Sequence, residues 1–124
     1  FSPDGNSLYV ADDGIGVQKF SFNGSAWTLA YNFTSSASAN KAFGLAVDFG
    51  GTDAVVYWST PTDIWKATDL GVAATGTSIA TAGANYAFRG LEMAPTQVPE
   101  PTALSLAGIG LALLAFRQRV VARR

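Results

Sequence analysis

The chain of 124 residues contains no cysteine and no histidine. Without cysteine it has no disulfide, no thiolate metal ligand and no thiol nucleophile. Without histidine it cannot assemble a Ser-His-Asp or Cys-His catalytic system from its own residues. The glycine pairs Gly14-x-Gly16 and Gly108-x-Gly110 lack the third glycine of a dinucleotide site. The residues therefore indicate neither a catalytic site nor a cofactor site.

Positive charge is also scarce over most of the sequence. Up to Gln97 the chain has four Lys/Arg against eight Asp/Glu, whereas from Val98 onward it has four Arg against Glu100 alone. Binding to nucleic acid usually needs a basic patch. The acidic body therefore argues against a nucleic-acid partner, and the C-terminal end holds a separate group of basic residues.

The C-terminal 27 residues combine three features in order. Pro99 and Pro101 each fix φ and lack an amide hydrogen, so an extended, accessible linker is expected around Glu100. Residues 102–116 are uncharged and place large apolar side chains on every side of a helix, as in lipid or a deep core. Basic side chains, which membranes retain on the cytoplasmic side, come last: Arg117, Arg119, Arg123 and Arg124.

The apolar run is short for a membrane span. Residues 102–116 rise roughly 22 Å as a helix, against a hydrocarbon core of about 30 Å. With Arg117 and Arg119 reaching toward the headgroups, a transmembrane helix over about residues 102–119 comes close to a full crossing. A soluble helix at the end of a domain is the alternative, but arginines directly after an uncharged run favour the membrane.

The segment Val98-Pro99-Glu100-Pro101, the apolar run and the terminal arginines resemble the PEP-CTERM protein-sorting signal of bacteria. The same tail is also catalogued as the C-terminal domain of ice-binding proteins, a label that describes the tail only. The resemblance implies an exosortase, a membrane-embedded processing enzyme, as partner. It further implies transient anchoring in the lipid bilayer with the C-terminus cytoplasmic, removal of the helix, and delivery to the cell surface or an exopolysaccharide matrix. Gln118 and residues 120–122 interrupt the basic block of the family pattern.

The body contains an internal repeat, and the chain opens inside a turn, Ser2-Pro3-Asp4-Gly5-Asn6, so upstream sequence is expected. Repeats of nearly fifty residues with four short strands each are typical of propeller blades. An offset of 48 residues aligns four pairs without a gap: Leu8 with Val56, Tyr9 with Tyr57, Val10 with Trp58, and Val17 with Trp65.

Short apolar runs between turn residues predict a succession of strands. Asn23-Gly24 between two such runs is the strongest short-range signal for a hairpin. The expected strands span residues 7–11, 16–22, 26–33, 43–48, 54–59, 63–68 and 78–81, and residues 88–93 are expected to begin a third unit. Four side chains of the third strand are expected to share one face: Trp27, Leu29, Tyr31 and Phe33.

The opening phrase FSPDGNSLYVA is similar to blades of YVTN-type and lactonase-like β-propellers. This resemblance implies an all-β fold, the C-terminal fragment of a β-propeller with about two four-stranded antiparallel blades, followed by the C-terminal helix. Two blades cannot close a ring, so most of the propeller is expected upstream, with residues 88–93 as a candidate closing strand. A β-sandwich is the alternative, since both folds stack twisted antiparallel sheets.

Two groups of residues are candidate sites. Carboxylates in the loops between second and third strands suit a hard cation, but Asp in a turn usually caps its own backbone, so no metal site is assigned. Tryptophans suit stacking on sugars, but their alternation with apolar residues favours packing. The carboxylates are Asp12, Asp13 and Asp63, and the tryptophans are Trp27, Trp58 and Trp65.

The sequence thus predicts two parts: incomplete propeller blades over residues 1–97 and a sorting segment over residues 98–124. We interpret the chain as an exported, non-enzymatic surface or matrix protein whose partners are an exosortase, the bilayer and an exopolysaccharide. A lactonase-like hydrolase with its active site in upstream blades is one alternative. A single-pass protein that keeps its helix permanently is another.

Overall fold

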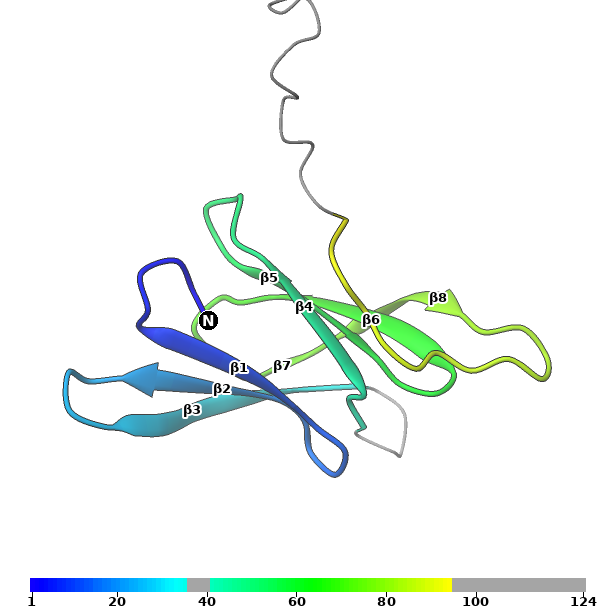
Figure 1. Cartoon of the computed structure of the whole chain (residues 1–124), viewed down its shortest axis with the longest axis horizontal. Helices are drawn as coiled ribbons and strands as arrows, with labels where there is room; N and C mark the ends of the chain where they lie inside the picture. Colours follow the sequence, from blue (N-terminus) through cyan, green and yellow to red (C-terminus); the bar gives the residue numbers. More distant parts are fainter. Residues whose placement is uncertain (36–40, 95–124) are drawn as a thin grey trace, which may run out of the picture. The chain divides into compact units, whose positions relative to one another are not determined.

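The protein, seen in a computed structural model that describes residues 1–35 and 41–94, is built from two four-stranded β-sheets (Figure 1). The described residues contain no helix, so the expected all-β class is confirmed. The first sheet, in order, consists of β1 (Ser7–Asp12), β2 (Gly16–Phe22), β3 (Trp27–Thr34) and β7 (Ala74–Thr75). The second consists of β4 (Gly44–Asp48), β5 (Val55–Ser59), β6 (Asp63–Thr68) and β8 (Thr77–Thr81).

The strands expected in the first two units are all present, with ends that differ by one residue at most. The expected strand over residues 88–93 is wrong, because this segment joins no ladder. It passes instead over the face of the second sheet at Gly44, where an added Cβ would lie 2.3 Å from the nitrogen of Leu91. Phe88 N–H donates to the carbonyl of Pro61 at 3.0 Å, outside any sheet.

The hairpin between β2 and β3 turns at Asn23-Gly24, as predicted. Gly24 has φ of 91°, a conformation that glycine adopts without steric cost. The side-chain oxygen of Asn23 accepts hydrogen bonds from the amides of Ser25 and Ala26 at 3.0 and 2.9 Å. The side-chain hydrogen bonds of Asn23 and the positive φ of Gly24 therefore stabilise the turn, and both are typical of these residue types in turns.

A β-bulge in β3 divides the four side chains that were expected to share a face. Tyr31 pairs with Lys19 and Leu29 pairs with Phe20, so Ala30 is the extra residue. Because neighbouring residues of β2 point to opposite faces, Tyr31 and Phe33 face inward while Trp27 and Leu29 face outward. The prediction of one shared face is wrong, since it assumed an unbroken period of two.

The short strand β7 crosses from the second unit to the first sheet. It pairs in parallel with β3, so this sheet is not purely antiparallel as expected. The chain then returns through Gly76, whose amide donates to the carbonyl of Thr34 at 2.8 Å. An added Cβ at Gly76 would lie 2.3 Å from Cη2 of Trp58, so only glycine fits under the indole ring.

The two sheets pack on each other through a single apolar core. Trp58 and Trp65 pair across β5 and β6 and stack with ring centroids 6.5 Å apart. Fully buried side chains of both sheets meet there, because alternate residues of each strand point to this interface. The buried members of the cluster are Tyr9, Val17, Phe33, Ala42, Val56, Trp58, Trp65 and Ala67.

The register of the hairpins corrects the gapless repeat alignment. Tyr9 pairs with Lys19 in the first unit, and Tyr57 pairs with Lys66 in the second. The corresponding residues are thus 48 apart in the first strand of each hairpin and 47 apart in the second. The loop of the second hairpin is one residue shorter, and Val17 corresponds to Ile64 rather than to Trp65.

The chain divides into a compact unit over Phe1–Met93 and a second unit over Ala94–Arg124. Within the part of the chain that the structure describes, no helix is long and apolar enough to cross a membrane. The transmembrane helix predicted over about residues 102–119 lies outside the described residues.

Candidate functional site

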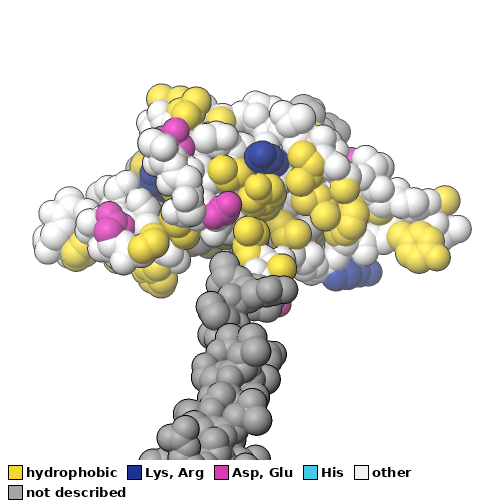
Figure 2. Space-filling view, turned by 90° about the horizontal axis from the view of Figure 1, so that it is seen from above, with side chains coloured by type: hydrophobic (Ala, Val, Ile, Leu, Met, Phe, Trp, Pro, Cys, Tyr) yellow, Lys and Arg dark blue, Asp and Glu magenta, His cyan; other side chains and the backbone are white. Residues whose placement is uncertain are grey.

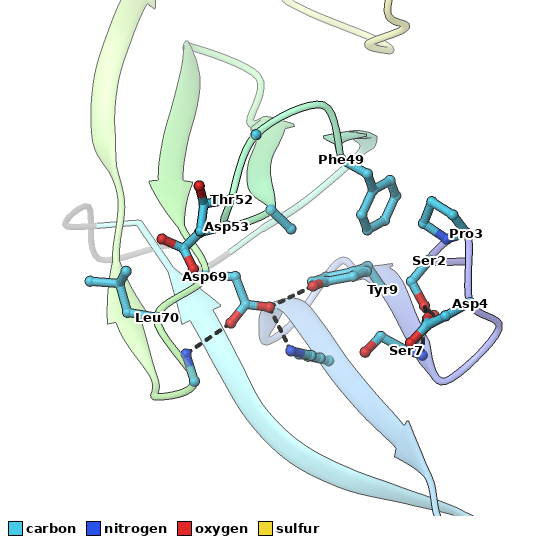
Figure 3. A pocket seen from close by; sticks show the side chains of 14 residues that line it. Ser2, Pro3, Asp4, Ser7, Tyr9, Phe49, Thr52, Asp53, Asp69 and Leu70 are labelled. Carbon is cyan, nitrogen blue, oxygen red and sulfur yellow. Dashed lines mark hydrogen bonds and ion pairs between the residues drawn. The ribbon is translucent and has the colours of Figure 1, made fainter.

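A buried polar cluster joins the two sheets at one end of the core. Asp69 follows β6 of the second sheet, and three strands of the first sheet each direct one side chain toward it: Tyr9 from β1, Lys19 from β2 and Tyr31 from β3. The three residues are register partners on one face, which brings them together despite their separation in sequence. Figure 3 shows Asp69 directed toward the hydroxyl group of Tyr9.

The carboxylate of Asp69 accepts four hydrogen bonds. Tyr9 Oη and Lys19 Nζ donate to Oδ2 at 2.5 and 2.7 Å. Tyr31 Oη and the amide of Gly71 donate to Oδ1, the latter at 3.1 Å. Lys19 Nζ also donates to Tyr31 Oη at 2.9 Å. Because the Asp69 side chain is only 4% exposed, these donors replace the water that it gives up on folding.

The charges of the cluster stabilise one another. Burial works against the carboxylate, but hydrogen bonds from Lys19, both tyrosines and the Gly71 amide outweigh it and lower the pKa of Asp69 to about 2. Burial also works against the ammonium, yet its bonds to Asp69 and Tyr31 raise the pKa of Lys19. Burial and then the Asp69 hydrogen bond raise the pKa of both tyrosines, which therefore remain hydrogen-bond donors.

An open pocket of about 530 Å³ lies over this cluster (Figure 3). Tyr9 and Phe49 form an aromatic wall, with ring centroids 6.0 Å apart. Asp4 binds within its own turn, accepting from Ser2 Oγ at 2.5 Å and from the amide of Asn6 at 3.1 Å. The other lining residues are Pro3, Ser7, Lys19, Gly51, Thr52, Asp53, Ala54, Asp69, Leu70 and Gly71.

The pocket offers hydrogen-bond acceptors and aromatic surface rather than reactive groups. Its one buried carboxylate, Asp69, has all its bonds directed to protein donors. The described residues contain no group of three acidic side chains placed to hold a metal ion. The arrangement can bind a polar ligand, and its buried part chiefly fixes the two sheets together.

The three candidate carboxylates, Asp12, Asp13 and Asp63, do not come together as a site. Asp12 Oδ1 accepts from the amides of Gly14 and Ile15, both at 2.8 Å, which is the backbone-capping role that the turn chemistry favoured. Asp13 forms an exposed ion pair with Lys41 at 3.4 Å. Asp63 accepts from three hydroxyl groups, those of Thr62, Ser78 and Thr81.

The tryptophans divide between core and surface. Trp58 and Trp65 are 0% and 5% exposed and form the centre of the core. Trp27 is 38% exposed and packs with Phe22 at 5.2 Å and Phe1 at 5.8 Å between ring centroids. Packing therefore accounts for Trp58 and Trp65, in agreement with the interpretation drawn from their alternation with apolar residues.

The sequence alone did not reveal the Asp69 cluster. Asp69 precedes Leu70 and Gly71 in what looks like an ordinary turn, and 60 residues separate it from Tyr9. The available signal was Lys19, the one charged residue of the strand predicted over residues 16–22. A buried lysine needs a carboxylate partner, but the sequence does not say which.

Residues 97–120 match the model of the PEP-CTERM protein-sorting motif. The match covers Val98-Pro99-Glu100-Pro101, Arg117 and Arg119, and ends before Arg123 and Arg124. All these residues lie outside the part that the structure describes. The motif supports export of the protein and sorting by an exosortase. No curated protein and no solved structure matches the chain.

Proposed function

We propose that this chain is an exported bacterial surface or matrix protein that its C-terminal segment anchors in the membrane until an exosortase removes the segment. The match of residues 97–120 to the PEP-CTERM motif carries this proposal. The body, in the proposed division residues 1–97, is the cargo. The sorting segment, residues 98–124, directs the protein to the exosortase.

The chemistry of the tail suits each proposed step. Pro99 and Pro101 keep the backbone around Glu100 out of helix and sheet, so an enzyme has access to it. The uncharged run over residues 102–116, extended by Arg117 and Arg119 reaching toward the headgroups, holds the chain in the bilayer as a helix over about residues 102–119. The terminal arginines hold the C-terminus on the cytoplasmic side, because their transfer through hydrocarbon is costly.

The sorting proposal is tested by separating membrane and extracellular fractions of a host with exosortase. The unmodified chain should appear outside the membrane, whereas Pro99→Ala/Glu100→Ala/Pro101→Ala should accumulate in the membrane fraction. Pro95→Ala/Thr96→Ala, just upstream of the matched residues 97–120, is the control and should be released normally. Equal release of all three forms would contradict the proposed role of Val98–Pro101, and equal retention would favour permanent anchoring.

For the body we propose a non-enzymatic role as the end of a β-propeller that binds or organises matrix material. Two stacked four-stranded sheets support a propeller origin. The open pocket with its aromatic wall of Tyr9 and Phe49 suits a polar polymer such as an exopolysaccharide. Co-sedimentation with host exopolysaccharide tests this role. Binding should weaken at least several-fold in Phe49→Ala and persist in Tyr86→Ala, an exposed aromatic residue outside the pocket.

A further inference from the structure

The pocket over the Asp69 cluster has two walls, and both belong to this chain. The first sheet contributes Tyr9 and the turn before β1, and the second sheet contributes the connection between β4 and β5, which includes Phe49. Phe1 packs on Trp27, which faces away from the second sheet. The pocket therefore lies between two sheets of one chain, and its shape depends neither on an uncovered outer face nor on a free sheet edge.

The charges that line the pocket do not balance. The lining residues include three carboxylates, Asp4, Asp53 and Asp69, and one ammonium group, that of Lys19. Lys19 and Asp69 form an ion pair at 2.7 Å, so their charges compensate each other. Asp4 and Asp53 remain, and both are exposed. The pocket therefore carries an excess of two negative charges, three carboxylates less one ammonium.

The two remaining carboxylates lie on either side of the aromatic wall. Figure 3 shows Asp4 on one side of the Tyr9 and Phe49 rings and Asp53 on the other. The hydrogen bond from Ser2, together with others in the same turn, lowers the pKa of Asp4, so its carboxylate is ionised at neutral pH. Asp53 forms no ion pair within the described residues, so its carboxylate is available to a ligand.

The negative charge of the pocket is local. On the face seen in Figure 2, charged side chains stand singly among hydrophobic and neutral ones, so the selection of a charged ligand depends on individual residues. Aromatic rings offer a flat apolar surface on which the ring of a sugar can lie. An ammonium group on such a sugar forms strong hydrogen bonds with carboxylates, whereas an anionic sugar is repelled by them.

We propose that the pocket binds polymers of amino sugars whose amines are free and protonated, and that Asp53 selects these polymers over neutral and anionic ones. This ligand assignment rests on the binding role proposed above for the same pocket. Phe49 supports the sugar ring, and Asp53 accepts a hydrogen bond from the ammonium group. An N-acetylated unit has no charge to offer, so it leaves the carboxylate without a charged partner and binds more weakly.

Calorimetric titration of the full chain in detergent micelles with two oligomers of equal length, one of glucosamine and one of N-acetylglucosamine, tests this selection. At low salt the glucosamine oligomer should bind at least several-fold more tightly, and the difference should shrink at high salt. Asp53→Asn should remove the preference. Asp13→Asn is the matched control, because it removes the same charge at the opposite end of β1 from the pocket, and it should keep the preference.

The outcomes separate the choice of ligand from the binding role itself. Equal binding of the two oligomers, or a preference that survives Asp53→Asn, would overturn the selection of amino sugars by Asp53 and leave the binding role standing. Equal loss of the preference in Asp13→Asn would show a response to net charge alone and would also overturn it. If neither oligomer binds while host exopolysaccharide still binds in a Phe49-dependent way, only the ligand assignment fails. If the exopolysaccharide does not bind either, the binding role fails as well.

Discussion

Asp69 accepts hydrogen bonds from three side chains of the first sheet and from the amide of Gly71. Asp69→Asn keeps the size of the side chain but removes the charge that compensates the buried ammonium of Lys19. Breaking one member of a buried ion pair leaves the other uncompensated. We expect the free energy of unfolding to fall by about 2–4 kcal/mol, measured by urea denaturation.

Asp53→Asn is the matched control for this substitution. Asp53 lines the same pocket, is exposed, and forms no ion pair within the described residues. The control should change the free energy of unfolding by less than about 0.5 kcal/mol. Equal effects of the two substitutions would show that the cluster does not hold the sheets together.

The pH dependence of unfolding follows from the same carboxylate. The pKa of Asp69 is lowered from 3.8 to about 2 in the folded protein, so its contribution is fully present above about pH 4. The contribution is lost as the pH falls toward 2, and it amounts to about 2 kcal/mol. Denaturation of the unmodified chain and of Asp69→Asn at several pH values should therefore give a difference that shrinks between pH 4 and pH 2. A difference independent of pH would contradict the assigned ionisation.

Single residues were predictable from sequence where their partners are local. Asp12 and Asn23 accept hydrogen bonds from amides two and three residues further along the chain. Such bonds are typical of Asp and Asn in turns, so the local sequence predicts them. Lys19 bonds Asp69 across 50 residues, and no local pattern encodes that pairing. Long-range polar contacts depend on how sheets stack, which single-sequence patterns do not specify.

At the scale of elements, the return of the chain from β7 to β8 depends on Gly76. Gly76→Ala would drive Cβ to 2.3 Å from Cη2 of Trp58, a ring that is fully buried and unable to move away. We expect a loss of about 1–3 kcal/mol in the free energy of unfolding, measured by thermal or urea denaturation.

Gly83→Ala provides the comparison for Gly76→Ala. At Gly83 the nearest atom to an added Cβ belongs to Tyr86 and lies 3.6 Å away, which is ordinary contact. This substitution should leave stability nearly unchanged. If Gly76→Ala were as stable as Gly83→Ala, the close packing of Trp58 on the backbone would be refuted.

The elements were largely predictable because each strand is bounded by turn residues. The hairpin at Asn23-Gly24 and the strands Gly16–Phe22 and Asp63–Thr68 agree with their expected positions. The bulge at Ala30 and the strand Ala74–Thr75 were not predicted, since both depend on pairing with a neighbouring strand. Residues 88–93 look like a strand by composition but find no ladder partner in the described body.

At the scale of the whole molecule, the sequence predicted an all-β body and a C-terminal sorting segment for different reasons. The repeated pattern of short apolar runs between turn residues predicts repeated sheets, and the structure contains two four-stranded sheets. The sorting segment was predictable because Pro-Glu-Pro, an apolar run and arginines form one linear signal, which the match at residues 97–120 supports.

The most direct test of the central claim is the mass of the mature protein. The chain should be expressed behind an export signal in paired hosts with and without exosortase, and the extracellular and membrane fractions analysed by intact-mass spectrometry. We predict that the host with exosortase yields a form that lacks the residues after the Pro-Glu-Pro segment, whereas the host without it retains the full C-terminus through Arg124. An intact C-terminus in both hosts would contradict exosortase processing.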